Sequence, residues 1–292
     1  MDWVPFLFID AVCHQLQSKW YNQVSQLSEQ WSTVGAKHDE KRREFRFAWS
    51  ANDQEVSYLI TKRGEEDFSA QVGELDFTYD RITAVTSEHQ DHSGKTHVSL
   101  DKLQRDVFPT VASLVANCRW HYLNPERSAQ SLLFFKAFQN CPGFNQIQLQ
   151  DHGEETREFV SRQLELANVE IVNIETYTAT TWPQPEELCR TLSNFVNSAR
   201  FRGLFAFVRV PNDFELVELF LARAMAGELM EGACIWVQIS FAKSQLGALH
   251  REHREDSEKL AWRIPNSNSR VQDAWTVHFG YISLSVDQEK RF

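Results

Sequence analysis

Glycine is scarce in this chain, and its scarcity limits the chemistry that the sequence can support. Only 11 of the 292 residues are Gly, and no glycine-rich phosphate-binding motif of the P-loop or dinucleotide type is present. The five cysteines are scattered and never stand at the two-residue spacing that zinc knuckles and redox motifs use. We therefore expect no nucleotide or other cofactor, no metal centre, and reduced, mostly buried thiols.

Long apolar runs and an excess of positive charge are missing as well. No run reaches the roughly 18 apolar residues of a membrane helix, and the apolar amino terminus lacks a basic leader and a small-residue cleavage site. Lys and Arg total 30 against 40 for Asp and Glu, a net charge of −10 that argues against nonspecific binding to nucleic acid phosphates. We expect a cytoplasmic or nuclear protein that binds neither membrane nor nucleic acid.

Apolar and aromatic residues are abundant, so the chain is expected to fold. Hydrophobic residues make up 42% of it, with 21 Phe and 9 Trp. Its length exceeds the usual domain size of about 100–150 residues. The pattern divides the chain into a helical segment over residues 1–50 and a repeat-like α/β domain over residues 51–292. In the first segment, apolar residues at helical spacing predict a helix over Phe6–Leu16.

The next hundred residues mix helical and strand patterns. A second helical pattern runs over Val24–Val34, and the mixed-charge stretch 37–46 is typical of a solvated helix face. Alternating aromatic residues predict a strand over residues 45–49. Val56–Thr61 and Glu74–Tyr79 are predicted as further strands.

From about residue 100 onward, helices alternate regularly with short strands. The predicted strands are Cys118–Leu123, Phe144–Gln150, Val169–Glu175, Gly203–Val210, Cys234–Ser240 and Trp275–Ser285. The predicted helices are Leu100–Val115, Ser128–Phe138, Glu154–Ala167, Pro185–Ser198 and Asp213–Glu228. Strands that are joined through helices of this length pair in parallel.

Two architectures fit this alternation. A doubly wound open α/β sheet carries helices on both faces, so its strands are apolar on both sides. A leucine-rich-repeat-like solenoid is a parallel sheet with helices on one face, so its strands alternate. Ile147 and Leu149 do alternate with glutamines. The pattern therefore favours an irregular leucine-rich-repeat-like solenoid, and the doubly wound sheet stays the alternative because Phe205 and Phe207 would also suit a two-sided core.

The bare face of such a solenoid is the surface that we expect to bind a protein partner. Parallel strands place alternate side chains side by side, and aromatic and arginine residues dominate interface energies. The predicted binding residues are Gln146, Gln148, Gln150, Phe205, Phe207, Arg209, Trp236 and Gln238. The sequence thus predicts a non-enzymatic protein-protein interaction module.

Two other functions stay open at this point. An enzyme on a doubly wound sheet would use Asp151, His152 and Asp213, which follow the carboxyl ends of strands. Loop and helix-cap roles explain these residues more simply. A homo-oligomeric structural or regulatory protein could instead pair through an exposed terminal strand around Trp275–Ser285. Histidines with ligand-like spacing, such as His250 and His253, are interpreted as exposed surface rather than as metal ligands.

The amino-terminal segment resembles an F-box. Residues Val4–Leu16 have the hydrophobic-Pro start that leads into an apolar helix, and Leu27–Trp31 resembles the later F-box segment that ends near a tryptophan. More closely, Met1–Pro5, Trp262–Asn268 and Gly280–Leu284 are similar to expanded nematode families of F-box-like proteins with a carboxy-terminal associated domain.

This resemblance implies a substrate-recognition adaptor of a cullin-type ubiquitin ligase. The amino-terminal helices would dock a Skp-type ligase subunit, and the repeat domain would capture a target. The docking residues would be Val4, Pro5, Phe8, Ile9, Val12 and Leu16. The chain departs from the F-box pattern because apolar residues stand where an acidic residue usually follows Pro5. In the alternative interpretation, these apolar residues cap the first repeat of the solenoid.

Overall fold

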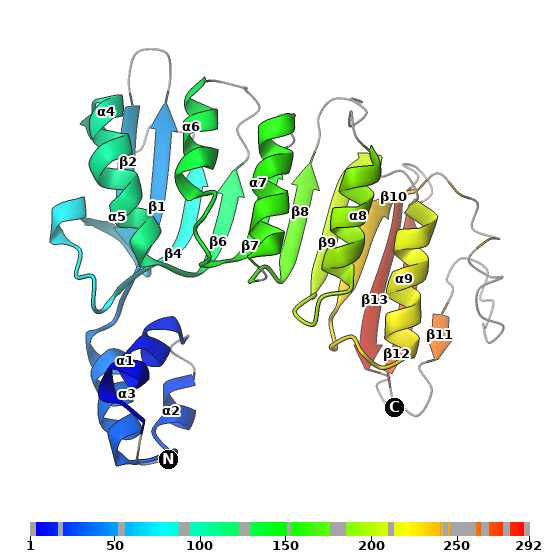
Figure 1. Ribbon diagram of the computed structural model, residues 1–292, viewed down its shortest axis with the longest axis horizontal. Helices are drawn as coiled ribbons and strands as arrows, with labels where there is room; N and C mark the ends of the chain where they lie inside the picture. Colours follow the sequence, from blue (N-terminus) through cyan, green and yellow to red (C-terminus); the bar gives the residue numbers. More distant parts are fainter. Residues whose placement is uncertain are drawn as a thin grey trace. The chain divides into compact units, whose positions relative to one another are not determined.

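The computed structural model describes residues 4–16, 20–51, 56–87, 94–122, 129–150, 153–166, 168–175, 185–209, 213–239, 241, 245, 261–263, 269–276 and 281–288. The chain packs into two compact units, residues 1–145 (unit 1) and 146–292 (unit 2). It is an α/β protein in which helices alternate with the strands of a mostly parallel mixed sheet (Figure 1). Among the described helices, none combines the length and the apolar character that crossing a membrane requires.

Unit 1 begins with three helices that share a small core of their own. They are α1 (Phe6–Gln15), α2 (Tyr21–Val24) and α3 (Glu29–Lys41). Their core consists of Ile9, Cys13, Tyr21, Val24, Trp31 and Val34. The helix predicted from Phe6 is confirmed. The single helix predicted over Val24–Val34 is wrong, because the backbone is extended at Ser28 and Leu27 is exposed.

The helices of the amino-terminal segment end at Lys41, and a mixed sheet follows. Its strands are β1 (Arg43–Ala51), β2 (Val56–Lys62), β3 (Glu65–Ser69), β4 (Asp80–Ser87), β5 (Thr96–Val98) and β6 (Val115–Tyr122). The strand order in unit 1 is β3-β2-β1-β4-β6, with β5 beside β2. Strand β4 is parallel to both β1 and β6, whereas β2 is antiparallel to β1.

An aromatic core lies between this sheet and its helices. The helices are α4 (Leu100–Lys102), α5 (Phe108–Leu114) and α6 (Ala129–Phe138), with a π-helical turn at Leu103–Val107. The ring of Phe134 stacks on Trp49 with centroids 4.5 Å apart and on Trp120 with centroids 4.6 Å apart. The aromatic residues at positions 45, 47 and 49 are all buried, which confirms the strand predicted from their alternation.

The strand predicted over Glu74–Tyr79 is wrong. The chain forms a 3-10 turn, η2 (Val72–Glu74), and then a turn that side chains close. Asp76 Oδ1 accepts a hydrogen bond from Thr78 N at 2.8 Å, and Asp80 Oδ2 accepts one from Asp76 N at 2.7 Å. An aspartate that binds the backbone two residues on favours a turn over a strand. Strand β4 therefore begins only at Asp80.

Unit 2 carries the regular alternation that the sequence predicts. Its elements are β7 (Phe144–Gln150, most of which belongs to unit 2), α7 (Glu154–Glu165), β8 (Ile171–Glu175), α8 (Pro185–Val196), β9 (Gly203–Arg209), α9 (Asp213–Met225), β10 (Cys234–Gln238), β11 (Ala261–Arg263), β12 (Ser269–Thr276) and β13 (Tyr281–Gln288). Strands β7, β8, β9 and β10 pair in parallel in that order. Strands β13, β12 and β11 continue the sheet in antiparallel pairs beyond β10.

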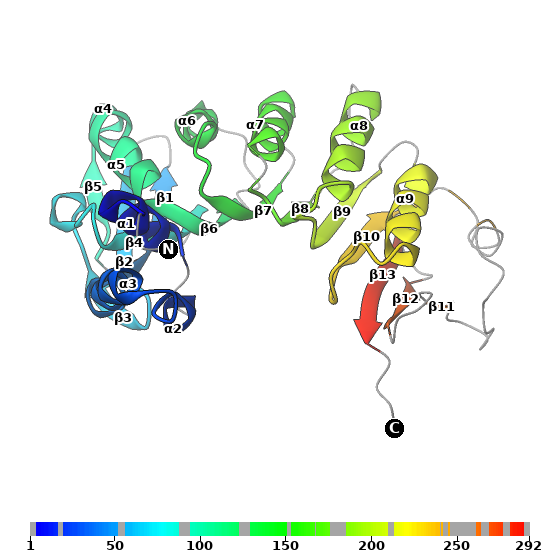
Figure 2. The same cartoon turned by 60° about the horizontal axis from the view of Figure 1, so that its bottom comes forward.

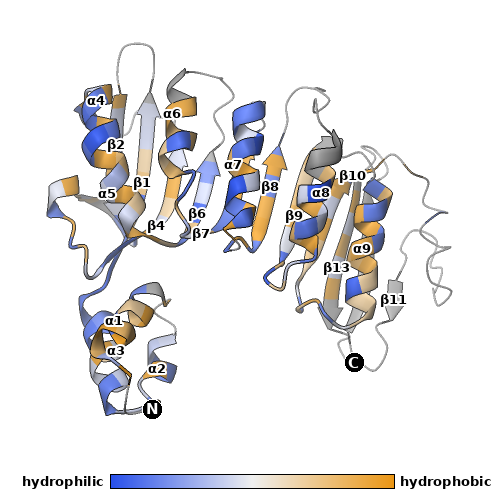
Figure 3. Ribbon diagram, in the orientation of Figure 1, coloured by the Kyte–Doolittle hydropathy of each residue, from blue (hydrophilic) through white to orange (hydrophobic). Residues whose placement is uncertain are grey.

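One face of the unit 2 sheet is buried against α7, α8 and α9, which all lie on that face in Figures 1 and 2. Its side chains have no exposed surface: Ile147, Leu149, Val172, Ile174, Leu204, Ala206, Ile235, Val237, Ile282 and Leu284. The facing helix residues include Phe159, Leu192 and Phe220, which are also buried. Strand β8 is coloured largely hydrophobic in Figure 3, whereas α7, α8 and α9 carry both hydrophobic and hydrophilic residues. The predicted two-residue alternation of these strands is confirmed.

The strand predicted over Trp275–Ser285 is a pair of strands. The chain reverses direction between Thr276 and Tyr281, which are register partners of β12 and β13, and residues 277–280 lie outside the described residues. Strand β13 pairs with β10 and β12, and β12 pairs with β13 and β11. The predicted exposed edge is therefore wrong for residues 281–285, because β13 lies between β10 and β12. On the outer side of β12, β11 pairs only with residues 270–272, so the structure does not test the prediction for Trp275 and Thr276.

Candidate functional site

The strands of unit 2 present a second face, opposite α7, α8 and α9, which we call the open face. We define it by Gln146, Gln148, Gln150, Asn173, Glu175, Phe205, Phe207, Trp236 and Gln238. Successive residues of a strand point to opposite faces, so these positions alternate with the fully buried ones. All of them are half-buried except Gln150, which is 5% exposed.

The parallel register brings the residues of the open face into rows across the strands. Gln148 lies beside Asn173, Asn173 beside Phe205, and Phe205 beside Trp236. In the next row, Gln150 lies beside Glu175. The rows therefore have amide and carboxylate groups on β7 and β8 and aromatic rings on β9 and β10.

The polar half of the open face is organised by one carboxylate. Gln148 Nε2 donates to Glu175 Oε1 at 3.1 Å, and Asn173 Nδ2 donates to the same oxygen at 3.3 Å. Both amides come from the row beside Glu175, so their NH2 groups turn toward the negative charge. The carboxylate of Glu175 has no cationic partner among the described residues.

The aromatic half of the open face is a small ring cluster. The ring of Trp236 lies 5.3 Å from that of Phe207 and 6.4 Å from that of Phe205, in tilted arrangements. Large half-buried aromatic side chains of this kind can add apolar contact to a partner at a low entropy cost.

The structure brings the predicted binding residues of the open face together. Gln146, Gln148, Gln150, Phe205, Phe207, Trp236 and Gln238 all lie on it, and Arg209 ends β9 with its side chain outside the described residues. Asn173 and Glu175 were not predicted. The alternation of Val172 and Ile174 with these two polar residues is the same signal that identified the glutamines of β7.

A second candidate surface lies on α1. The side chains of Phe6, Leu7 and Phe8 are 53%, 80% and 55% exposed, and Pro5 is exposed beside them. We call Pro5, Phe6, Leu7 and Phe8 the α1 patch. Figure 3 shows α1 coloured hydrophobic. Four consecutive exposed apolar residues at a helix start are unusual for a surface that only meets water.

The structure divides the docking residues that the resemblance implies. Pro5 and Phe8 belong to the α1 patch. Ile9 is fully buried in the core of the three helices, so it supports the helix from within. Val4, Val12 and Leu16 are partly buried against the same core. Phe6 and Leu7 are exposed as well, although they are not among the implied docking residues. They stand where the chain departs from the F-box pattern.

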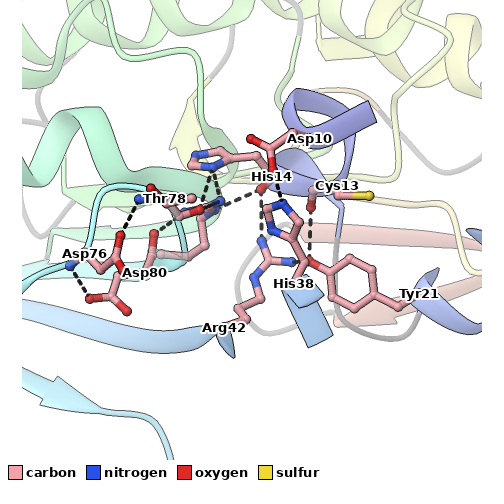
Figure 4. A network of polar contacts seen from close by, with 10 residues as sticks. Asp10, Cys13, His14, Tyr21, His38, Arg42, Asp76, Thr78 and Asp80 are labelled. Atoms are coloured by element: carbon pink, nitrogen blue, oxygen red, sulfur yellow. Dashed lines mark hydrogen bonds and ion pairs between the residues drawn. The ribbon is translucent and has the colours of Figure 1, made fainter. Parts of the chain in front are cut away.

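A polar network fixes the carboxyl end of α1 to the sheet of unit 1 (Figure 4). Arg81 of β4, which has no exposed surface, donates from Nε to the carbonyl of His14 at 2.9 Å and from Nη2 to the carbonyl of Thr78 at 3.0 Å. The same Nη2 also donates to His14 Nδ1. Arg42 donates to the carbonyls of His14 and Leu16. These cations satisfy carbonyls that a helix end leaves unpaired.

The electrostatics of this network favour an uncharged His14. Burial lowers the pKa of His14 from 6.5 to about 4, and the positive charge of Arg81 contributes to the same shift. Burial also lowers the pKa of Arg81 to about 9, so its guanidinium stays charged at neutral pH. His38, whose Nε2 lies 2.9 Å from Asp10 Oδ1, has a pKa that burial lowers in spite of this contact. The mixed-charge stretch 37–46 is a solvated helix face only in part, because His38 is buried and residues 43–46 belong to β1.

The residues considered for catalysis do not form a described constellation. Asp151 and His152 lie outside the described residues. Asp213 is 3% exposed at the start of α9, where its Oδ1 accepts from Phe214 N at 2.9 Å. The five cysteines are free thiols, and burial raises the pKa of each. Within the described ranges, no group of three or more acidic, histidine or cysteine side chains could hold a metal ion.

No family model and no curated protein matches this chain. Among solved structures, three crystal structures of the MycE methyltransferase from the mycinamycin biosynthetic pathway resemble it weakly. Two of them contain Mg and SAH, with 10% and 9% sequence identity and TM-scores of 0.25 and 0.26, and the third also contains mycinamycin VI, with 9% identity and a TM-score of 0.24. The matched regions cover 98–99% of this chain and 93–94% of the MycE chains. Scores this low assign neither a fold nor an activity to this chain.

Proposed function

We propose that this chain is a non-enzymatic protein-recognition module whose open face binds a protein partner. The observation that carries the proposal is the half-buried side of the unit 2 sheet that lies opposite α7, α8 and α9 and that no described helix covers. There, Phe205 and Trp236 stand in the same row as the amides of Gln148 and Asn173, and the ring of Phe207 lies beside that of Trp236. An apolar centre with polar neighbours is the usual composition of a protein interface.

A leucine-rich-repeat-like architecture of unit 2 is part of the same proposal. Within unit 2, the alternation of parallel strands with α7, α8 and α9 on one face supports an irregular leucine-rich-repeat-like arrangement. Repeat proteins of this type bind partners along the strand face that helices leave bare. The antiparallel strands β11, β12 and β13 would end the repeat series, since they follow the last parallel strand, β10.

We further propose that the α1 patch docks a second protein, a Skp-type subunit of a cullin-type ubiquitin ligase. The chain would then act as a substrate-recognition adaptor of that ligase. Support comes from the exposure of Phe6, Leu7 and Phe8, which the packing of the three helices leaves without an internal role. If α1 only capped the first repeat, these side chains would be covered.

The docking step can be tested with purified components. We expect the variant Phe6→Ala/Leu7→Ala to weaken binding of a purified Skp-type subunit by at least about 30-fold in titration calorimetry, since central interface aromatics contribute roughly 2 kcal/mol or more each. Phe77→Ala is the matched control, because Phe77 is an equally exposed aromatic of unit 1, at 57%. Equal affinity of wild type and the α1 variant would refute the ligase-docking proposal and leave the open face untouched.

The open face can be tested by photocrosslinking in cells. A photoreactive phenylalanine analogue at Phe205 should crosslink one dominant protein, and the crosslink should be lost when Trp236→Ala is added. The same analogue at Glu218, an exposed position of α9, is the control. If both positions give the same crosslinked proteins, or Trp236→Ala changes nothing, the open face is not the binding surface.

A further inference from the structure

Tyr79 stands on the turn before β4 and lies between two lysines of α3. The ammonium of Lys37 lies 5.8 Å from the centroid of the Tyr79 ring, and that of Lys41 lies 5.4 Å from it. The two lysines are four residues apart on the helix, so their side chains are neighbours on its surface. Tyr79 is half-buried, whereas both lysines are exposed. A partly exposed phenol is therefore flanked by two cations.

The charges of these two lysines are not balanced by a carboxylate of the described residues. Neither Lys37 nor Lys41 forms an ion pair within the part of the chain that the structure describes, although the whole chain has a net charge of −10. Like charges four residues apart on a helix repel each other. A hydrogen bond with the Tyr79 hydroxyl raises the pKa of Lys37, which places this oxygen within reach of the ammonium. An anion at the hydroxyl would therefore meet two cations that lack a partner among the described carboxylates.

The ring of Tyr79 is held at the junction between α3 and the turn (Figure 4). His38, which is 1% exposed, packs edge-on against this ring with centroids 5.4 Å apart. The carboxylates of the turn are already engaged: Asp80 pairs with Arg43 at 2.6 Å, and Asp76 Oδ1 accepts a hydrogen bond from a backbone N–H of the turn. These carboxylates therefore do not compete with an anion at Tyr79 for the two lysines.

We propose that Tyr79 is a phosphorylation site and that Lys37 and Lys41 bind its phosphate. A protein tyrosine kinase transfers the γ-phosphoryl group of ATP: the bond from Tyr79 Oη to phosphorus forms, the bond from phosphorus to ADP breaks, and a base of the kinase takes the phenolic proton. The phosphate carries about −1.5 to −2 charges at neutral pH and three acceptor oxygens, which two ammonium groups can share. Phosphorylation thereby ties α3, and with it the helices that carry the α1 patch, to the sheet of unit 1.

The first test asks whether the folded chain accepts a phosphate at Tyr79. A tyrosine kinase catalytic domain that phosphorylates the synthetic peptide of residues 72–86 is incubated with the full chain and ATP. Mass spectrometry should find phosphate on Tyr79 and none on Tyr58, a control tyrosine that is 4% exposed. Tyr79→Phe should remove the signal. Phosphorylation of the peptide but not of the folded chain, or of Tyr58 as fast as Tyr79, would overturn the assignment of the site.

The second test asks whether the two lysines bind the phosphate. Phosphotyrosine is placed at position 79 of the full chain by genetic code expansion, and its second ionisation is titrated by phosphorus NMR. The pKa of this step is ordinarily about 6, and we expect it to fall by at least about 0.5 because nearby cations favour the dianion. Lys37→Gln/Lys41→Gln should restore the ordinary value, whereas Lys102→Gln/Lys136→Gln, which removes two other exposed lysines of unit 1, should not. Equal pKa values in the phosphorylated chain and its Lys37→Gln/Lys41→Gln variant would refute phosphate binding by these lysines.

Discussion

The network around His14 predicts that the stability of unit 1 falls in mildly acidic solution. His14 accepts a hydrogen bond from Arg81, and burial with the charge of Arg81 lowers its pKa from 6.5 to about 4. The unfolded chain therefore binds more protons than the folded chain between these two pH values. Stability is complete above pH 6.5 and declines as the pH falls toward 4.

The size of the effect follows from the same shift. A change from 6.5 to about 4 corresponds to an upper bound of about 3 kcal/mol, since one unit of pKa is 1.36 kcal/mol. His14 is only half-buried, and solvent screening reduces this to about 1–2 kcal/mol at pH 4. At pH 5 we expect a loss of about 1 kcal/mol, or roughly 0.3 M in the urea midpoint.

Urea unfolding followed by circular dichroism at pH 7.5, 6.5, 5.5 and 5.0 measures this dependence. His14→Asn keeps an acceptor at the position of Nδ1 but cannot titrate, so its midpoint should vary less with pH than that of wild type. His38, whose pKa burial also lowers, leaves a residual slope in the variant. His97→Asn, in the short strand β5, is the control. An equal pH slope in wild type and His14→Asn would refute the reasoning.

Two further predictions concern stability and thiol reactivity. A Cβ at Gly143 would stand 2.3 Å from the carbonyl oxygen of Val115, so Gly143→Ala should destabilise the chain by about 2 kcal/mol or more. As the control, Gly73→Ala should leave the thermal midpoint nearly unchanged, because a Cβ at Gly73 meets nothing within 4 Å. Burial raises the pKa of Cys118 well above its usual value. This thiol should therefore react with a disulfide reagent at pH 8 only as fast as the chain unfolds. Labelling of Cys118 faster than unfolding would contradict its burial.

The faces of the unit 2 sheet could be predicted because strand geometry has a period of two. In β7, Ile147 and Leu149 are fully buried while Gln146 and Gln148 are half-buried, as their alternation indicates. The start of α7 was predicted at the correct residue as well, since the acidic pair Glu154 and Glu155 suits the positive end of a helix.

Turns and strand reversals escaped prediction where side-chain contacts decide the backbone. The segment 74–79 has strand-like composition, yet the carboxylates of Asp76 and Asp80 bind backbone N–H groups and close a turn. Composition alone does not reveal such contacts. In α1, likewise, helical spacing predicted an apolar stripe but not which residues face the core, so Ile9 was grouped with the exposed Phe8.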